Sequence, residues 1–210
     1  MNVNVSASGE PDFKIVPNVA YDFIEFTPAL EKLAAGADCV CFGTLIQRSE
    51  GSRVALYHFL DTARSAKKVL DLNLRRNCYN TGTIKESLRR ADILKLNESE
   101  LIELASLLQI ESVDPIANLN DQVAFFAQMI AGKFDLEVCI VTRGGEGSLA
   151  LKFAHADEGS THTHTTTIVP HSAYLVTVQD TCGSGDAFTA ASIHQYLDGK
   201  GIEGCSGYGN

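Results

Sequence analysis

Short apolar runs alternate with longer amphipathic segments from residue 38 onward, and this alternation restricts the fold of the chain more than any other feature. Four apolar runs have the length of buried strands, at residues 38–43, 68–73, 92–96 and 137–142. The amphipathic segments predict helices at residues 51–65, 83–90, 98–108 and 121–131. Strands that alternate with helices are typical of βαβ units, so we predict an α/β fold with a mostly parallel sheet.

The two ends of the chain follow other patterns. Beyond Gly147 the apolar period approaches two, which predicts short antiparallel or edge strands at residues 148–153, 163–169 and 173–178 before a last helix at 184–197. Near the start, strand-like residues at 3–5 and 13–16 flank turn residues and predict a hairpin, which we interpret as a small β-lid. We therefore divide the chain into partial lid strands at 1–26 and a partial α/β nucleotide-binding and catalytic domain at 27–210.

Composition narrows the possible partners. Seventeen Lys and Arg residues against 26 Asp and Glu residues give a net charge of −9, which opposes binding to nucleic acid or to an anionic membrane. No stretch approaches the ~20 apolar residues that span a bilayer. The six cysteines form no CxxC pair and most lie in apolar runs, as expected for reduced thiols of a cytoplasmic protein.

A glycine-rich turn, DTCGSGD at residues 180–186, lies between a predicted strand and the last predicted helix. Small residues let a ligand approach the backbone, and the first N–H groups of a helix attract anions, so Gly183, Ser184 and Gly185 form a candidate anion hole. A carboxylate repels a bound phosphate, so Asp186 is a candidate base for an attacking hydroxyl. It could equally be an acid placed favourably in the first turn of a helix, and spacing alone leaves both interpretations open.

A second glycine-rich turn, TRGGEG at residues 142–147, also follows a predicted strand. Its backbone amides and the Thr142 hydroxyl could contact a nucleotide, but the same residues could form a simple hairpin bend. The turn lacks the ending of a Walker A loop, so it does not identify a nucleotide site by itself.

Two polar groups follow predicted strands, at the edge where α/β sheets bind ligands. Asn97 and Glu100 could order a hydrated Mg²⁺ ion or form the capping box of the next helix. Asp71, Asn73 and Arg75 alternate, so they share one face and point either into a cleft or into solvent.

Together these motifs resemble the ribokinase-like, or PfkB, family of carbohydrate kinases. Residues 180–186 are similar to its DTxGxGD signature, 97–100 to its NxxE motif, 142–147 to its TxGxxG turn and 71–75 to its DxNxR segment. The motifs come in the family's order, and the resemblance extends from about Asn4 onward. It implies a three-layer α/β/α fold with a small β-lid, and ATP-dependent phosphorylation of a sugar hydroxyl.

The resemblance also implies a role for each matching residue. Asp186 would be the base, and Gly183, Ser184 and Gly185 would form the anion hole for the transferred phosphoryl group. The remaining roles would be nucleotide binding by Asn97, Thr142, Gly144 and Gly147, sugar binding by Asn73 and Arg75, magnesium binding through water by Glu100, and binding of a monovalent cation, K⁺, by Asp180.

The sequence departs from the family's pattern at both ends. Chains of this family usually begin with a further strand and a Gly-Gly segment that hold the sugar, and they continue around adenine beyond the position of Gly199. We therefore expect an internal fragment of a fructokinase-like or ribokinase-like kinase that retains the phosphoryl-transfer apparatus. The alternative is a catalytically inactive fragment that acts as a nucleotide-binding or dimerisation module, and in either case the lid could join two copies.

Overall fold

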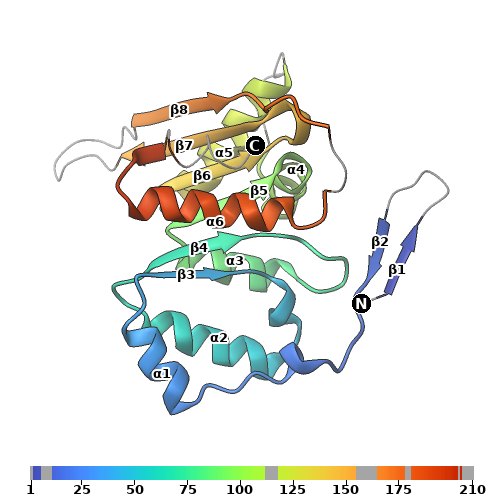
Figure 1. Ribbon diagram of the computed structural model, residues 1–210, viewed down its shortest axis with the longest axis vertical. Helices are drawn as coiled ribbons and strands as arrows, with labels where there is room; N and C mark the ends of the chain where they lie inside the picture. Colours follow the sequence, from blue (N-terminus) through green and yellow to red (C-terminus); the bar gives the residue numbers. More distant parts are fainter. Residues whose placement is uncertain are drawn as a thin grey trace.

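Six strands form one sheet in the order β3-β4-β5-β6-β7-β8 in the computed structural model, which describes residues 2–5, 11–111, 118–154, 165–177, 181–202 and 204 (Figure 1). The strands are β3 (Cys39–Phe42), β4 (Lys67–Asp71), β5 (Ile93–Asn97), β6 (Val138–Thr142), β7 (Ser148–Ala154) and β8 (Thr165–His171). The pairs from β3 to β6 are parallel, and β7 and β8 are each antiparallel to the preceding strand. The predicted α/β fold with a mostly parallel sheet is confirmed.

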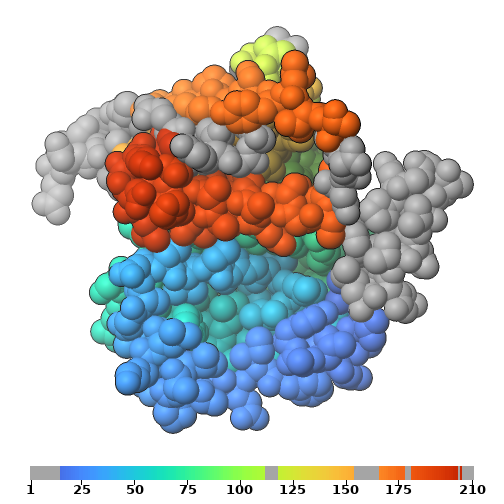
Figure 2. Space-filling model, in the orientation of Figure 1, coloured from blue at the N-terminus to red at the C-terminus, as the bar shows by residue number. Residues whose placement is uncertain are grey.

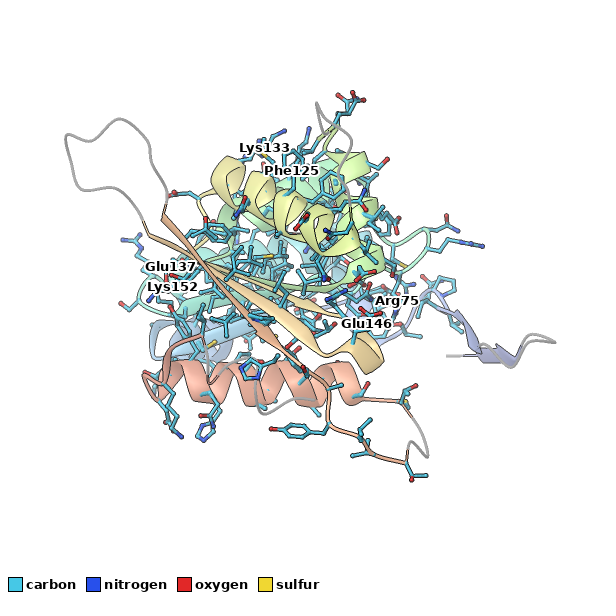
Figure 3. All side chains as sticks on the ribbon, turned by 90° about the horizontal axis from the view of Figure 1, so that it is seen from above. Arg75, Phe125, Lys133, Glu137, Glu146 and Lys152 are labelled. Atoms are coloured by element: carbon cyan, nitrogen blue, oxygen red, sulfur yellow. The ribbon has the colours of Figure 1, made fainter. Side chains whose placement is uncertain are left out.

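The helices cover the sheet on both faces and give the three predicted layers, seen end-on in Figure 3. On one face lie α1 (Pro28–Ala35), α2 (Glu50–Thr62), α3 (Thr81–Arg90), α4 (Glu98–Leu107) and α5 (Leu119–Phe134). The other face carries α6 (Ser184–Leu197), whose Phe188 packs against Val69, Ile93 and Ile140 of the sheet. Figure 2 shows α6 in red across this face, with the blue segment that contains α1 below it.

Asparagines begin three of these helices. Asn80, Asn97 and Asn118 each accept a hydrogen bond from the backbone N–H three residues later, at 2.9, 2.8 and 2.9 Å. An asparagine at this position satisfies a donor that the helix itself leaves unpaired. The capping role that the sequence offered for Asn97 is therefore confirmed.

The N-terminal strands β1 (Asn2–Val5) and β2 (Pro11–Lys14) pair as a two-stranded antiparallel sheet, in which Asn2 faces Lys14. The predicted hairpin is confirmed, although its second strand begins and ends two residues earlier than expected. A role as a lid stays a prediction.

An ion pair anchors the segment that follows this hairpin. The Arg48 guanidinium donates to both carboxylate oxygens of Asp22, at 2.8 and 2.7 Å, and to the carbonyl oxygen of Val16 at 2.8 Å. This guanidinium holds the pKa of Asp22 below its usual value. The pair thus ties residues 16–22 to the short 3-10 helix η2 (Leu45–Arg48), which precedes α2.

The last predicted strand, at residues 173–178, is wrong for the residues that are described. Residues 172–177 have no regular structure, and Tyr174, Leu175 and Val176 are exposed. The register explains the difference, because His171 already faces Ser148, the first residue of β7. Strand β7 therefore has no further residue with which residues after His171 could pair.

The sequence patterns also missed α1. This helix begins after Thr27, whose hydroxyl accepts a hydrogen bond from the Leu30 N–H at 3.3 Å.

Cys39, Cys41, Cys78 and Cys139 carry free thiols. Within the described ranges, no helix combines the length and the apolar character needed to cross a membrane.

Candidate active site

A cleft of about 260 Å³ lies where β3 and β4 end and α6 begins. The cleft joins Asp71, Asn73 and Arg75 to Asp186, although more than a hundred residues separate the first three from the last. The sequence left open whether Asp71, Asn73 and Arg75 face a cleft or solvent, and the structure places all three at a cleft. The remaining lining residues are Cys41, Phe42, Gly43, Thr44 and Leu45.

Two hydrogen bonds hold the loop that carries Asn73 and Arg75. The Thr44 hydroxyl donates to the Leu72 carbonyl oxygen at 3.0 Å, and the Leu74 N–H donates to the Glu100 carboxylate at 2.8 Å. Asn73 itself has a φ of 41°, a left-handed conformation that asparagine tolerates better than most residues. The loop between these two anchors is fixed at the mouth of the cleft.

The start of α6 supplies the opposite wall. Gly183 precedes the helix with a φ of 80°, a conformation that favours glycine, and Asp186 lies exposed in the first turn. The Ser184 N–H donates to the Thr181 carbonyl oxygen at 3.2 Å, so one of the three predicted anion-hole amides already has a partner. The N–H groups of Gly183 and Gly185 have no acceptor within the described part of the chain. Asp180 lies outside the described residues.

A second group of predicted residues lies at the ends of β5 and β6. Asn97 and Thr142 face each other in the parallel register, and the Thr142 hydroxyl donates to the Leu96 carbonyl oxygen at 3.4 Å. The buried Glu100 accepts the Asn97 N–H at 3.0 Å through one oxygen and the Leu74 N–H through the other. Glu100 therefore connects this group to the loop at the cleft.

The turn at residues 142–147 is the hairpin bend between β6 and β7. It contains the short 3-10 helix η3 (Gly144–Glu146), and Arg143 forms ion pairs with Glu98 at 2.9 Å and with Glu146 at 2.6 Å. Gly147 has a φ of 90°, and a Cβ added there would lie 1.9 Å from the His171 carbonyl oxygen. Packing within the chain thus accounts for this glycine, and nucleotide binding by Thr142, Gly144 and Gly147 stays a prediction.

The sequence did not single out the polar network beneath the cleft. The buried Lys95 ammonium lies 3.2 and 3.3 Å from the two carboxylate oxygens of Asp71, and the Thr189 hydroxyl lies 2.8 Å from one of them. A lysine inside an otherwise apolar strand was the available signal. Beside this network, desolvation and then the Asp71 carboxylate raise the pKa of the Cys41 thiol to about 11. Cys41 is therefore protonated at pH 7 and is a poor nucleophile.

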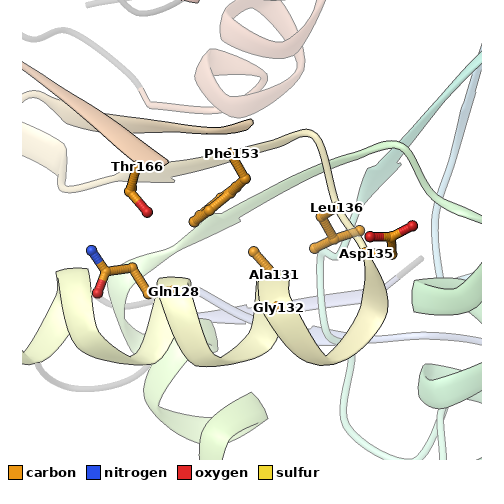
Figure 4. A pocket seen from close by; sticks show the side chains of 7 residues that line it. All are labelled: Gln128, Ala131, Gly132, Asp135, Leu136, Phe153 and Thr166. Carbon is orange, nitrogen blue, oxygen red and sulfur yellow. The ribbon is translucent and has the colours of Figure 1, made fainter. Parts of the chain in front are cut away.

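A larger cavity of about 390 Å³ contains none of the predicted residues (Figure 4). Its lining comes from the end of α5, the Leu136 that follows it and the paired residues Phe153 and Thr166 of β7 and β8. Leu136 precedes β6, so this cavity lies at the end of the parallel strands opposite to the cleft. Figure 3 shows the two ends, with Arg75 and Glu146 at one and Glu137 and Lys152 at the other.

Solved structures with the same fold include sugar kinases. A sugar kinase from Pyrococcus horikoshii in complex with ATP superimposes with a TM-score of 0.68 at 23% identity, over 96% of this chain and 57% of that one. A fructokinase with bound ATP from Xylella fastidiosa gives a TM-score of 0.67 at 18% identity, over 97% of this chain and 60% of that one. At these identities, the likeness shows the fold.

Sequence comparison agrees with the structural one. A 2-dehydro-3-deoxygalactonokinase from Haloferax volcanii is 25% identical over 167 residues, which are 77% of this chain and 45% of the relative. The chain thus spans about half the length of this curated relative. The model of the pfkB family carbohydrate kinases matches residues 3–210, nearly the whole sequence. The chain therefore belongs to the pfkB family of carbohydrate kinases.

Proposed function

We propose that this chain is the phosphoryl-transfer part of an ATP-dependent sugar kinase of the cytoplasm. One observation carries the proposal: the cleft joins an acid in the first turn of α6 to the asparagine and arginine of the loop after β4. Phosphoryl transfer needs positioning and charge stabilisation more than covalent chemistry. A helix N-terminus with an adjacent carboxylate, facing polar side chains across a cleft, supplies both.

Asp186 is the proposed base. Its side chain is exposed at the cleft, and no Lys or Arg among the described residues forms an ion pair with it. The carboxylate takes the proton of the sugar hydroxyl as that oxygen bonds to the γ-phosphorus of ATP. The bond from this phosphorus to the β–γ bridging oxygen breaks, and ADP leaves with the electron pair.

The start of α6 is the proposed anion hole for the transferred group. Negative charge develops on the phosphoryl oxygens, and the N–H groups of Gly183 and Gly185 have no acceptor in the described chain. The Ser184 N–H contributes by sharing its hydrogen bond with Thr181. The dipole of the 14-residue helix adds partial positive charge at the same point.

The remaining roles follow the family motifs. We assign Asn97, Thr142, Gly144 and Gly147 to the nucleotide, Asn73 and Arg75 to the sugar, and Asp180 to a monovalent cation such as K⁺. When bound, Mg²⁺ neutralises charge on the phosphate oxygens. Glu100 suits a hydrated ion rather than direct coordination, because each of its oxygens already accepts a backbone N–H and retains a lone pair for a water molecule.

The acceptor is proposed to be a sugar or a sugar acid. The Haloferax relative is named for a sugar acid and the Xylella neighbour for fructose, and an arginine in the cleft can bind either a carboxylate or hydroxyl groups. We also propose a homodimer joined through the β1–β2 hairpin, because a two-stranded sheet leaves an edge of each strand available for pairing.

The test measures ADP release with fructose, ribose and 2-dehydro-3-deoxygalactonate, using the full-length gene product and this chain. Asp186→Asn in the full-length enzyme should lower kcat about a thousandfold and leave Mg-ATP affinity nearly unchanged. Asp198→Asn, an exposed acid after the other end of α6, is the matched control and should retain activity. An Asp186→Asn enzyme with the wild-type kcat would refute the proposed base.

A further inference from the structure

A buried ion pair lies between the sheet and the first turns of α6. Asp71 on β4 and Lys95 on β5 face each other in the parallel register, and the residues are only 9% and 8% exposed. The Lys95 Nζ lies 3.2 and 3.3 Å from the two carboxylate oxygens. Both charges are thus held together beneath the helix that carries Asp186.

Thr189 connects this pair to α6. Its hydroxyl lies 2.8 Å from an Asp71 oxygen and 2.9 Å from the Gly185 carbonyl oxygen. The hydroxyl has one hydrogen to donate, and the carboxylate is the stronger acceptor. The second turn of α6 is therefore tied to the sheet through a charged group.

The Lys95 ammonium approaches the first turn directly. A Cβ added to Gly185 would lie 3.4 Å from the Lys95 Nζ, and no other side chain of the described residues comes within 4 Å of that point. The Asp71 carboxylate is therefore farther from Gly185 than the ammonium is. The ammonium end of the ion pair is therefore the end nearer to Gly185, one of the predicted anion-hole residues.

Stability alone does not account for this pair. One step earlier on the same face, Val69 and Ile93 occupy the equivalent positions and pack against α6. Burying two charges costs desolvation free energy, and an apolar pair of similar volume often stabilises a protein as well or better. The change from apolar to charged residues occurs where the strands reach the cleft, so it coincides with the proposed site of the anion.

We infer that Lys95 is a positioning residue for phosphoryl transfer, which with Asp71 and Thr189 fixes the first turns of α6 and places positive charge behind the anion hole. The inference rests on the proposed function, because it takes the start of α6 as the place where the phosphoryl group binds. Of its three residues, Lys95 and Thr189 lie outside the four family motifs, and Asp71 is the first residue of one of them.

Pyrophosphate binding to this chain, followed by NMR at the Gly185 and Asp186 amides, tests the charge without sugar or catalysis. Lys95→Gln keeps a donor for Asp71 and removes the charge, and should weaken binding about fivefold or more. Lys95→Arg should stay within about twofold of the wild type. Lys152→Gln is the matched control, since this exposed lysine lies at the opposite end of the sheet (Figure 3).

Thr189→Val tests positioning with both charges in place. Amide hydrogen exchange at Ala187, whose N–H donates to the Gly183 carbonyl oxygen at 2.9 Å, should become about tenfold faster, with the urea midpoint of global unfolding shifted little. If Lys95→Gln fails to fold, the hydrogen exchange of Thr189→Val still tests the positioning role. Wild-type pyrophosphate affinity in Lys95→Gln, or unchanged exchange in Thr189→Val, would overturn the inference. If this chain binds pyrophosphate in a way that depends on Lys95 but the full-length enzyme has no kinase activity, the proposed function is refuted and the role of Lys95 in anion binding is not.

Discussion

Two glycine-rich turns lie at the edge of the sheet where the parallel strands end, and their glycines are required for different reasons. The turn after β6 is packed against its own chain, since a Cβ on Gly147 would overlap the His171 carbonyl oxygen at 1.9 Å. The turn before α6 is open, since a Cβ on Gly183 would have no neighbour within 4 Å. Similar sequences thus produce one turn that closes the fold and one that leaves space for a ligand.

This difference shows what glycine spacing can and cannot predict. Both turns contain a glycine with positive φ, which explains the residue type without any ligand. The two kinds of glycine are distinguished by the atoms around them: one lies against neighbouring backbone, and the other faces open space that a substrate can occupy. We expect substitutions in the two turns to affect different properties.

The largest expected effect is that of Gly147→Ala on stability. The added methyl group meets fixed backbone atoms in a left-handed conformation, so the free energy of unfolding should fall by about 3 kcal/mol or more. Urea denaturation measures the loss. Gly145→Ala, in the same turn with open space and no positive φ, is the control and should change stability by less than about 0.5 kcal/mol. Equal losses in both variants would contradict the packing argument.

Gly183→Ala should have an intermediate effect. The residue has a φ of 80° without steric overlap, so the strain should lower the free energy of unfolding by about 1 kcal/mol. Pyrophosphate affinity should fall as well, because a relaxed turn moves the first amides of α6. Gly183→Asn should recover part of both losses, since asparagine tolerates this conformation. A stability loss as large as that of Gly147→Ala would show that this turn is closed too.

The smallest effect is expected for Gly185→Ala. This residue has no positive φ, and its added Cβ would make an ordinary contact with the Lys95 Nζ at 3.4 Å. Thermal unfolding should shift by less than the equivalent of about 0.5 kcal/mol. A large loss of stability here would mean that the ammonium has no freedom to move beneath the helix.

The sequence predicted most of the sheet because the parallel strands are buried and largely apolar. The strands β5 and β6 each have four buried positions and β4 has three, and all three strands lie within two residues of the predicted ranges. The segment 173–178 resembled a strand equally well by composition. It is not one at the described residues because pairing depends on where β7 begins, which local patterns do not reveal.

The candidate site was predicted in part. Motif spacing identified Asp186 and the loop with Asn73 and Arg75, and the fold brings them to one cleft. Lys95 and Thr189 were missed because their contacts with Asp71 cross from strand to strand and from sheet to helix. Such contacts exist only once the layers have packed.

The two oxygens of Glu100 have a mechanical consequence. One oxygen holds the Leu74 N–H and the other holds the Asn97 N–H, so a single rigid carboxylate spans the loops assigned to sugar and to nucleotide. A shift of either loop strains its hydrogen bond to this carboxylate. We therefore expect a ligand that binds at either loop to affect the other loop through this one side chain.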